Sequence, residues 1–216
     1  MLLLQVLNSP ILAIGFLAGI LLAISIHEYA HAWAAVKAGD LTPKLAGRLT
    51  LNPVAHLDLL GTIFLLLAGF GWGKPVPINP FNLKDPQKSQ AWIALAGPVA
   101  NILLASLLSI PIRLDQFGLW PHTLLALKAL EVLHIIIEIN LLLAVFNLLP
   151  IPPLDGSKIL FAFVSQETQV AIEQIGPWIL FVLLFISFAT PFNIFSATLL
   201  PLVQYLNYLV TAFPFT

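Results

Sequence analysis

The chain has 216 residues, of which 59% are hydrophobic and only 9% are charged, and its mean hydropathy is +0.97. A soluble domain has about 25% charged residues, so this composition excludes a water-soluble surface and makes a lipid bilayer the expected solvent. The net charge of −1 excludes nucleic acid as a partner, because phosphate binding needs a basic excess, and the lack of cysteine excludes disulfides and thiolate metal sites.

Long apolar segments recur along the chain and are separated by stretches rich in proline and glycine. They predict an all-α polytopic membrane protein with about five to six membrane segments, folded as a single domain over residues 1–216. We expect the first helix to be retained, because it has neither the basic start nor the small-residue cleavage site of a signal peptide. The predicted helices are spans at residues 11–36, 89–112, 123–149 and 170–189, a short amphipathic helix at 157–164, and a fifth span or interfacial helix at 194–212.

The region between the first and second spans has a different pattern. Residues 41–51 alternate apolar and polar side chains, which predicts a β-strand. The apolar run at residues 57–70 has 14 residues, which is too short to cross a bilayer comfortably and favours a re-entrant segment. We therefore expect a short β/re-entrant element here, followed by a loop at residues 71–86.

The distribution of lysine and arginine predicts the orientation in the membrane. If residues 57–70 are re-entrant, seven of the nine basic residues lie on one side and two lie near the other. Because basic residues collect on the cytoplasmic side, we expect a multi-pass protein of the cell membrane whose N-terminus is external. The seven residues on the cytoplasmic side are Lys37, Lys44, Arg48, Lys74, Lys84, Lys88 and Lys158.

A metal-binding pattern lies inside the first predicted span, where the residues from His27 to His31 read H-E-Y-A-H. Side chains four apart share one helix face about 6 Å apart, so the two imidazoles can hold one Zn²⁺ while Glu28 acts as a general base. A structural cluster of hydrogen bonds is the alternative, but a charged residue at the centre of a span costs roughly 2.5–3.5 kcal/mol, which favours a functional site. His27 follows Ile11 by 16 residues, roughly 24 Å of helix, which puts the metal inside the bilayer nearer the cytoplasmic face.

A segment broken by prolines offers a third metal ligand, and a catalytic zinc usually has three from the protein. Residues 147–156 read N-L-L-P-I-P-P-L-D-G, so the third span ends there in irregular backbone of the kind that lines a cavity at membrane depth. Asp155 is then free to reach the metal. The alternative is that Asp155 caps a helix starting near Ser157, and taken alone the residue favours that cap.

Three motifs in this order resemble the site-2 protease family of intramembrane zinc metalloproteases. They are H-E-Y-A-H at residues 27–31, G-P-V-A-N at residues 97–101 and N-L-L-P-I-P-P-L-D-G at residues 147–156. The pattern N-P-V-A-H-L-D at residues 52–58 is similar to one in the compact branch of the family, which has no PDZ or CBS domain. The resemblance covers about residues 20–165 and implies a catalytic core at about residues 11–165, followed by C-terminal helices at about residues 169–212.

The resemblance also implies the chemistry of the site. It implies one Zn²⁺ per chain and cleavage of a transmembrane protein or peptide, within or near its membrane segment, in regulated intramembrane proteolysis. We expect an asparagine of the site to hydrogen-bond the substrate backbone or the developing oxyanion, and the strand at residues 44–51 to pair with the unwound substrate. The implied site residues are the metal ligands His27, His31 and Asp155, the base Glu28, and the asparagines Asn101 and Asn147.

Two further groups of residues have more than one interpretation. We interpret His56 and Asp58 as loop and helix-cap residues, with substrate gating or support of the metal ligands as the alternative. Glu131, His134 and Glu138 form one stripe on the third span. We interpret this stripe as a hydrogen-bonded seam against the C-terminal helices, with a second metal site or a water path as the alternative.

Two other functions fit part of the pattern. A membrane metal-ion transporter also has buried histidines and acids, but it would spread its ligands over several spans around a two-sided path. A catalytically silent chaperone of the same fold would not need Glu28, which is intact. The sequence therefore favours a zinc metalloprotease, and it leaves the substrate, the gating mechanism and the oligomeric state open.

Overall fold

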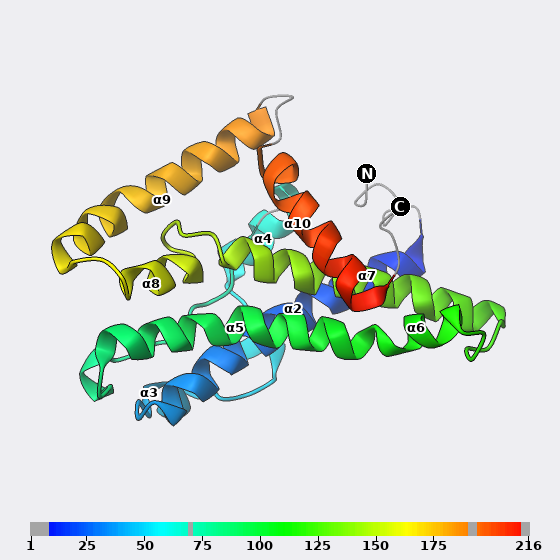
Figure 1. Cartoon of the computed structure of the whole chain (residues 1–216), viewed down its shortest axis with the longest axis horizontal. Coiled ribbons are helices and arrows are strands. Elements are labelled where there is room, and N and C mark those ends of the chain that lie inside the picture. The colour runs from blue at the N-terminus through cyan, green and yellow to red at the C-terminus, as the bar shows by residue number, and fades with distance from the viewer. Residues whose placement is uncertain (1–8, 69–70, 190–193, 213–216) are drawn as a thin grey trace.

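The computed structural model describes residues 9–68, 71–189 and 194–212, and its regular secondary structure in these ranges is helical (Figure 1). Four segments are long and apolar enough to cross a membrane, namely Pro10–Lys37, Pro86–Gln116, Leu124–Asn147 and Gln166–Ser187. This agrees with an all-helical multi-pass membrane protein, whereas the expected five to six spans are not confirmed. The helices are α2 (Pro10–Lys37), α3 (Thr42–Leu45), α4 (Leu59–Ala68), α5 (Pro86–Leu108), α6 (Ile110–Gln116), α7 (Leu124–Asn147), α8 (Asp155–Phe161), α9 (Gln166–Ala189) and α10 (Ile194–Thr211), with 3-10 turns at Pro53–Ala55 and Pro80–Asn82.

Helices α2, α5 and α7 pack against one another and form the core of the described chain (Figure 1). Two glycines let α2 approach α7 closely: a Cβ at Gly15 would lie 3.0 Å from Val132, and one at Gly19 would lie 2.8 Å from Ile139. Helix α7 also packs against α10 through a buried apolar cluster that includes Ile137. Helix α8 packs against α5, while α9 extends away from the core above α8 in the view of Figure 1.

The β-strand expected at residues 41–51 is wrong. The short helix α3 and a turn occupy this region, with Pro43 in the first turn of the helix and Gly47 at a φ of +69°, which breaks an extended chain. The alternation gave a wrong prediction because it does not mark a buried apolar face: Leu45 is 85% exposed, whereas Arg48 is buried. The described residues 41–51 form no strand, so the expected pairing of a strand here with an unwound substrate has no support in the structure.

Helix α4 occupies most of the apolar run at residues 57–70 and is 10 residues long, about half of what a full span needs. Asp58 caps its start, because the carboxylate Oδ1 accepts a hydrogen bond from the N–H of Gly61 at 2.8 Å. A single antiparallel bridge joins Leu57 to Gly73. That this segment is re-entrant stays a prediction, because the short length of α4 is the observation that favours it.

Asp40 joins three segments just after the end of α2. Its buried carboxylate accepts hydrogen bonds from the N–H and hydroxyl of Thr42 and, at 2.7 Å each, from the N–H of Asn79 and the amide of Asn82. Burial disfavours the charged form, but these donors outweigh it and hold the pKa of Asp40 below its ordinary value of 3.8. The carboxylate thereby fixes the loop before α5 to the end of α2 and to α3.

Candidate metal centre

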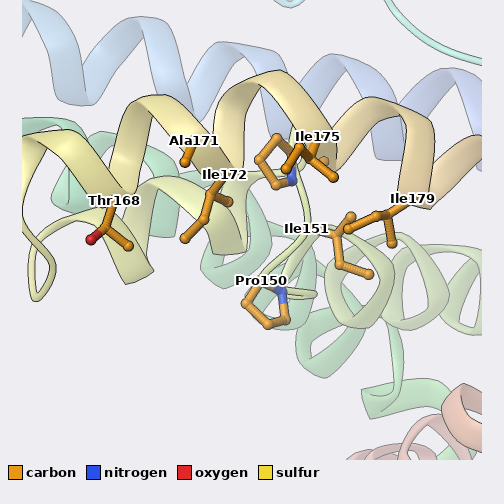
Figure 2. Close-up of a pocket in the computed structure, with 9 residues that line it drawn as sticks. Pro150, Ile151, Thr168, Ala171, Ile172, Ile175 and Ile179 are labelled. Carbon is orange, nitrogen blue, oxygen red and sulfur yellow. The ribbon is translucent and has the colours of Figure 1, made fainter.

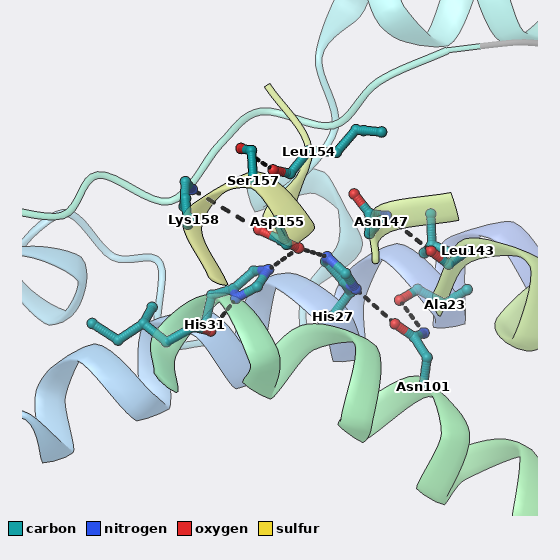
Figure 3. Close-up of polar contacts among 11 residues, drawn as sticks. Ala23, His27, His31, Asn101, Leu143, Asn147, Leu154, Asp155, Ser157 and Lys158 are labelled. Atoms are coloured by element: carbon teal, nitrogen blue, oxygen red, sulfur yellow. Dashed lines mark hydrogen bonds and ion pairs between the residues drawn. The ribbon is translucent and has the colours of Figure 1, made fainter. Parts of the chain in front are cut away.

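The two histidines of the first span and the aspartate after the broken third span converge in one place (Figure 3). The Nε2 atoms of His27 and His31 lie 3.0 and 3.1 Å from the same carboxylate oxygen, Oδ2 of Asp155. One ligand atom from each residue lies within 4.8 Å of the other two, and all three residues are buried. Among the described residues, no other group of His, Cys, Asp and Glu side chains has this geometry.

Each imidazole is oriented by a hydrogen bond at its other nitrogen. The Nδ1 atom of His27 lies 2.7 Å from Oδ1 of Asn101, and that of His31 lies 2.7 Å from the carbonyl oxygen of Ile93. Because both partners are acceptors, Nδ1 must donate in each ring, which leaves the Nε2 lone pair free for a metal. Both rings are therefore held in the tautomer that a metal ligand needs.

Asn101 is itself fixed by a buried network between helices. Its amide nitrogen donates to the carbonyl oxygen of Ala23 at 3.0 Å and to Oδ1 of Asn140 at 2.8 Å, while the Asn140 amide donates to the carbonyl oxygen of Ile136. Both amide hydrogens of Asn101 are thus used within the protein, and none remains for a substrate. Sequence reasoning did not assign Asn140, although a polar amide inside an apolar helix is a signal that could have marked it.

Helix α5 approaches the two imidazoles through Gly97. A Cβ at this position would lie 2.6 Å from Nε2 of His31 and 2.7 Å from Cε1 of His27, which is closer than real contacts allow. Only glycine therefore lets the α5 backbone come this near to both rings. This close approach explains why the motif G-P-V-A-N begins with glycine. Asn101, the last residue of the motif, follows Gly97 by about one helical turn.

Asp155 is the first residue of α8 and does not act as its cap. Leu154 is the cap residue, and no side chain bonds the free N–H groups there. The carboxylate instead faces the two imidazoles, and Lys158 lies 3.9 Å from its second oxygen. The helix-cap alternative for Asp155 is therefore wrong.

Helix α9 lies against the loop that leads to Asp155. A Cβ at Gly176 would collide with the ring of Pro152, so the helix backbone touches the loop directly. Beside this contact lies a pocket of about 230 Å³, lined almost entirely by apolar side chains such as Pro150, Ile151 and Ile172 (Figure 2). The residues that line this pocket do not include His27, His31 or Asp155, so the pocket is separate from the metal centre.

Three other predicted site residues, Glu28, His56 and Asn147, lie outside the three-ligand cluster, and Glu28 is half-buried on α2. A Cβ at Gly73 would lie 3.9 Å from Oε1 of Glu28 and 3.1 Å from the carbonyl oxygen of His56. The ring of His56 is buried, with Nε2 at 2.7 Å from the carbonyl oxygen of Thr50, so it bonds loop backbone. Asn147, at the end of α7, is half-buried and donates its amide to the carbonyl oxygen of Leu143.

The acidic stripe on α7 does not join the metal centre. Lys128 pairs with Glu131 at 2.7 Å at the exposed start of the helix. Glu131, His134 and Glu138 form no potential metal-binding group in the part of the chain that the structure describes. This gives no support to a second metal site on this helix, and the seam against the C-terminal helices stays a prediction.

The donor set at the centre fits zinc. Two neutral imidazole nitrogens and one carboxylate oxygen are the ligands of several catalytic zinc sites, which keep a fourth position open. The separations of 3.0 and 3.1 Å between Nε2 and Oδ2 are close to those of ligands about 2 Å from one shared ion. Fold and site together define a multi-pass membrane protein with a His–His–Asp metal centre.

Comparison with known proteins identifies the family. Residues 106–190 match Peptidase family M50. The chain is 38% identical over 171 residues to the "Putative zinc metalloprotease YwhC" of Bacillus subtilis, covering 78% of each chain, and 32% identical over 183 residues to the "Putative zinc metalloprotease Rip2" of Mycobacterium tuberculosis, covering 82% of this chain and 68% of that one. No solved structure matches. The chain belongs to the site-2 protease family, Peptidase family M50, and is a zinc metalloprotease.

Proposed function

We propose that the chain is an intramembrane endopeptidase that hydrolyses peptide bonds within or near the transmembrane segments of other membrane proteins. His27, His31 and Asp155 hold one Zn²⁺, and Glu28 is the general base. The observation that supports this most directly is the convergence of three buried ligand atoms from a membrane-length helix and from the segment that follows α7. The whole of residues 1–216 is proposed as one protease domain.

The residues of the site divide the chemistry between them. His27, His31 and Asp155 would hold the Zn²⁺, which when bound would supply a water molecule of lowered pKa and polarise the scissile carbonyl. Glu28, one residue after His27, accepts the proton of the attacking water and returns it to the leaving amine. Asn101 holds the His27 ring in place, because its Oδ1 accepts the hydrogen bond from Nδ1, the ring nitrogen that does not face Asp155. Two further hydrogen bonds of its amide nitrogen fix Asn101 itself.

The position of His27 along α2 indicates the depth of the site in the membrane. His27 lies 17 residues after Pro10, roughly 26 Å along a helix that crosses a hydrocarbon core of about 30 Å. The site is thus proposed to lie within the bilayer near the end of α2 marked by Lys37, which is the side richest in basic residues and therefore cytoplasmic. We place the protein in the cell membrane and propose α4 as a re-entrant segment on the same side.

Removal of the metal tests the proposed function. The purified chain in liposomes is expected to cut a transmembrane reporter, to lose this activity when a chelator removes its zinc, and to regain it when Zn²⁺ but not Mg²⁺ is added back, because the donor set suits zinc. The measurements are reporter cleavage on gels and metal content by elemental analysis. Unchanged cleavage by protein shown to be free of zinc would refute the proposal, and zinc movement into sealed vesicles without cleavage would favour a transporter.

Replacement of Asn101 with alanine separates support of a ligand from contact with the substrate. We expect zinc affinity to fall by about 10- to 100-fold, because the His27 ring loses the partner that fixes its tautomer. Competition with a chelator of known affinity measures this. Ser106→Ala is the control on the same helix, since its hydroxyl bonds only the carbonyl oxygen of Ile102. Normal zinc affinity combined with slow cleavage would instead support a hydrogen bond from Asn101 to the developing oxyanion.

A further inference from the structure

Arg48 is a buried cation in the loop between α3 and α4. Its side chain is only 5% exposed, and one terminal nitrogen donates a hydrogen bond to the carbonyl oxygen of Lys74 and lies 3.5 Å from Nδ1 of His56. Its Nε atom is buried and has no hydrogen-bond partner among the described residues. A buried guanidinium with an unused donor is costly to keep, so its retention calls for a physical reason.

The backbone that Arg48 binds lies next to Glu28. Lys74 follows Gly73, and it is at Gly73 that an added Cβ would lie 3.9 Å from Oε1 of Glu28. The N–H of Lys74 also donates to the carbonyl oxygen of His56 at 2.8 Å, so the two loops are joined at this point. Arg48 therefore holds the stretch of backbone that lies over the Glu28 carboxylate.

The positive charge of Arg48 also interacts favourably with the negative charge of Glu28. Burial lowers the pKa of Arg48, and the carboxylate of Glu28 is the charge that opposes this effect. A loop that needed only a hydrogen bond to a carbonyl could use a neutral amide, which would cost less to bury. Arginine adds a permanent positive charge on a rigid planar group.

We propose that Arg48 is a positioning residue of the protease, which holds the backbone of Gly73 and Lys74 over Glu28 and keeps the Glu28 carboxylate in place by its charge. This inference rests on the proposed role of Glu28 as general base. The loop between α3 and α4 thereby supports Glu28 through Arg48, without forming the β-strand that the sequence predicted.

The test compares three variants of the full chain in liposomes. Arg48→Met keeps the length of the side chain without charge, Arg48→Lys keeps the charge without the planar fork, and Lys44→Met removes an exposed charge from the neighbouring α3 as a matched control. We expect Arg48→Met to keep its zinc and its KM while kcat falls by about 10- to 100-fold, as when the support of a metal-site residue is lost. Arg48→Lys is expected to fall between Arg48→Met and the unchanged protein, and Lys44→Met to match the unchanged protein.

The outcomes separate positioning from a merely structural role. A normal kcat for Arg48→Met, or a loss confined to KM or to zinc content, overturns the inference. If Arg48→Met does not fold, Arg48→Lys decides: a lower kcat with zinc retained supports the inference, and a normal kcat or loss of zinc overturns it. Failure of the proposed function is recognised independently, because the unchanged protein would then cleave no faster than Glu28→Gln.

Discussion

Replacement of Glu28 with glutamine is expected to slow reporter cleavage by about 10²- to 10⁴-fold, the usual contribution of a general base. Glutamine has nearly the same shape as glutamate but cannot accept a proton from water at neutral pH. The two imidazoles and the carboxylate that converge beside it are unchanged, so the variant is expected to keep its zinc. Single-turnover cleavage in liposomes and metal analysis of the same sample measure both effects.

A matched control for this variant is Glu131→Gln, which removes an acid from an exposed position at the start of α7. It is expected to cleave at the normal rate, since Glu131 pairs only with Lys128 in the part of the chain described. Equal cleavage by Glu28→Gln and the unchanged protein would remove Glu28 from the mechanism. Loss of zinc from Glu28→Gln would instead show that this glutamate supports the metal.

Replacement of Gly97 with alanine is expected to weaken zinc binding although the new side chain is a single methyl group. The methyl carbon would lie 2.6 to 2.7 Å from ring atoms of His31 and His27, so both imidazoles must turn away from their positions facing Asp155. Overpacking of this kind costs about 1–3 kcal/mol, which corresponds to roughly a 5- to 150-fold loss of affinity. Cleavage at limiting zinc is expected to fall by the same factor.

Val99→Ile is the control for Gly97→Ala, because it adds one methylene to the same helix at a position that is 41% exposed. Zinc affinity from chelator competition, with reporter cleavage measured over a series of zinc concentrations, tests the pair. We expect excess zinc to restore part of the cleavage by Gly97→Ala. Full affinity in Gly97→Ala would mean that α5 can move away without disturbing the rings.

Short-range geometry explains what could be predicted from the sequence about this site. The spacing of His27 and His31 fixes two ligands on one helix face whatever the rest of the fold does. The prolines after Asn147 end a helix for local steric reasons, and this leaves Asp155 outside it. Apolar length likewise predicts the long helices to within a few residues of their observed bounds.

Contacts between residues far apart in the chain could not be predicted from the sequence. Asn101 was expected to face the substrate, but Asn140 and the Ala23 carbonyl occupy its amide hydrogens, and no local pattern shows that pairing. The alternation at residues 41–51 does not reveal that Leu41, Leu45 and Leu51 are exposed in the fold. Arg48 entered the sequence argument only as a positive charge that indicates orientation, because its burial depends on a loop 26 residues away.

The partly exposed segment at residues 74–79 is anchored at both ends. Arg48 binds the carbonyl at its start, and Asp40 accepts the N–H at its end. Between these anchors, Pro75 and Pro77 restrict the backbone further, because each proline ring locks its own φ. The segment, which begins directly after Gly73 near Glu28, is thus preorganised, and a peptide that docks along it would cause little loss of conformational entropy on the enzyme's side.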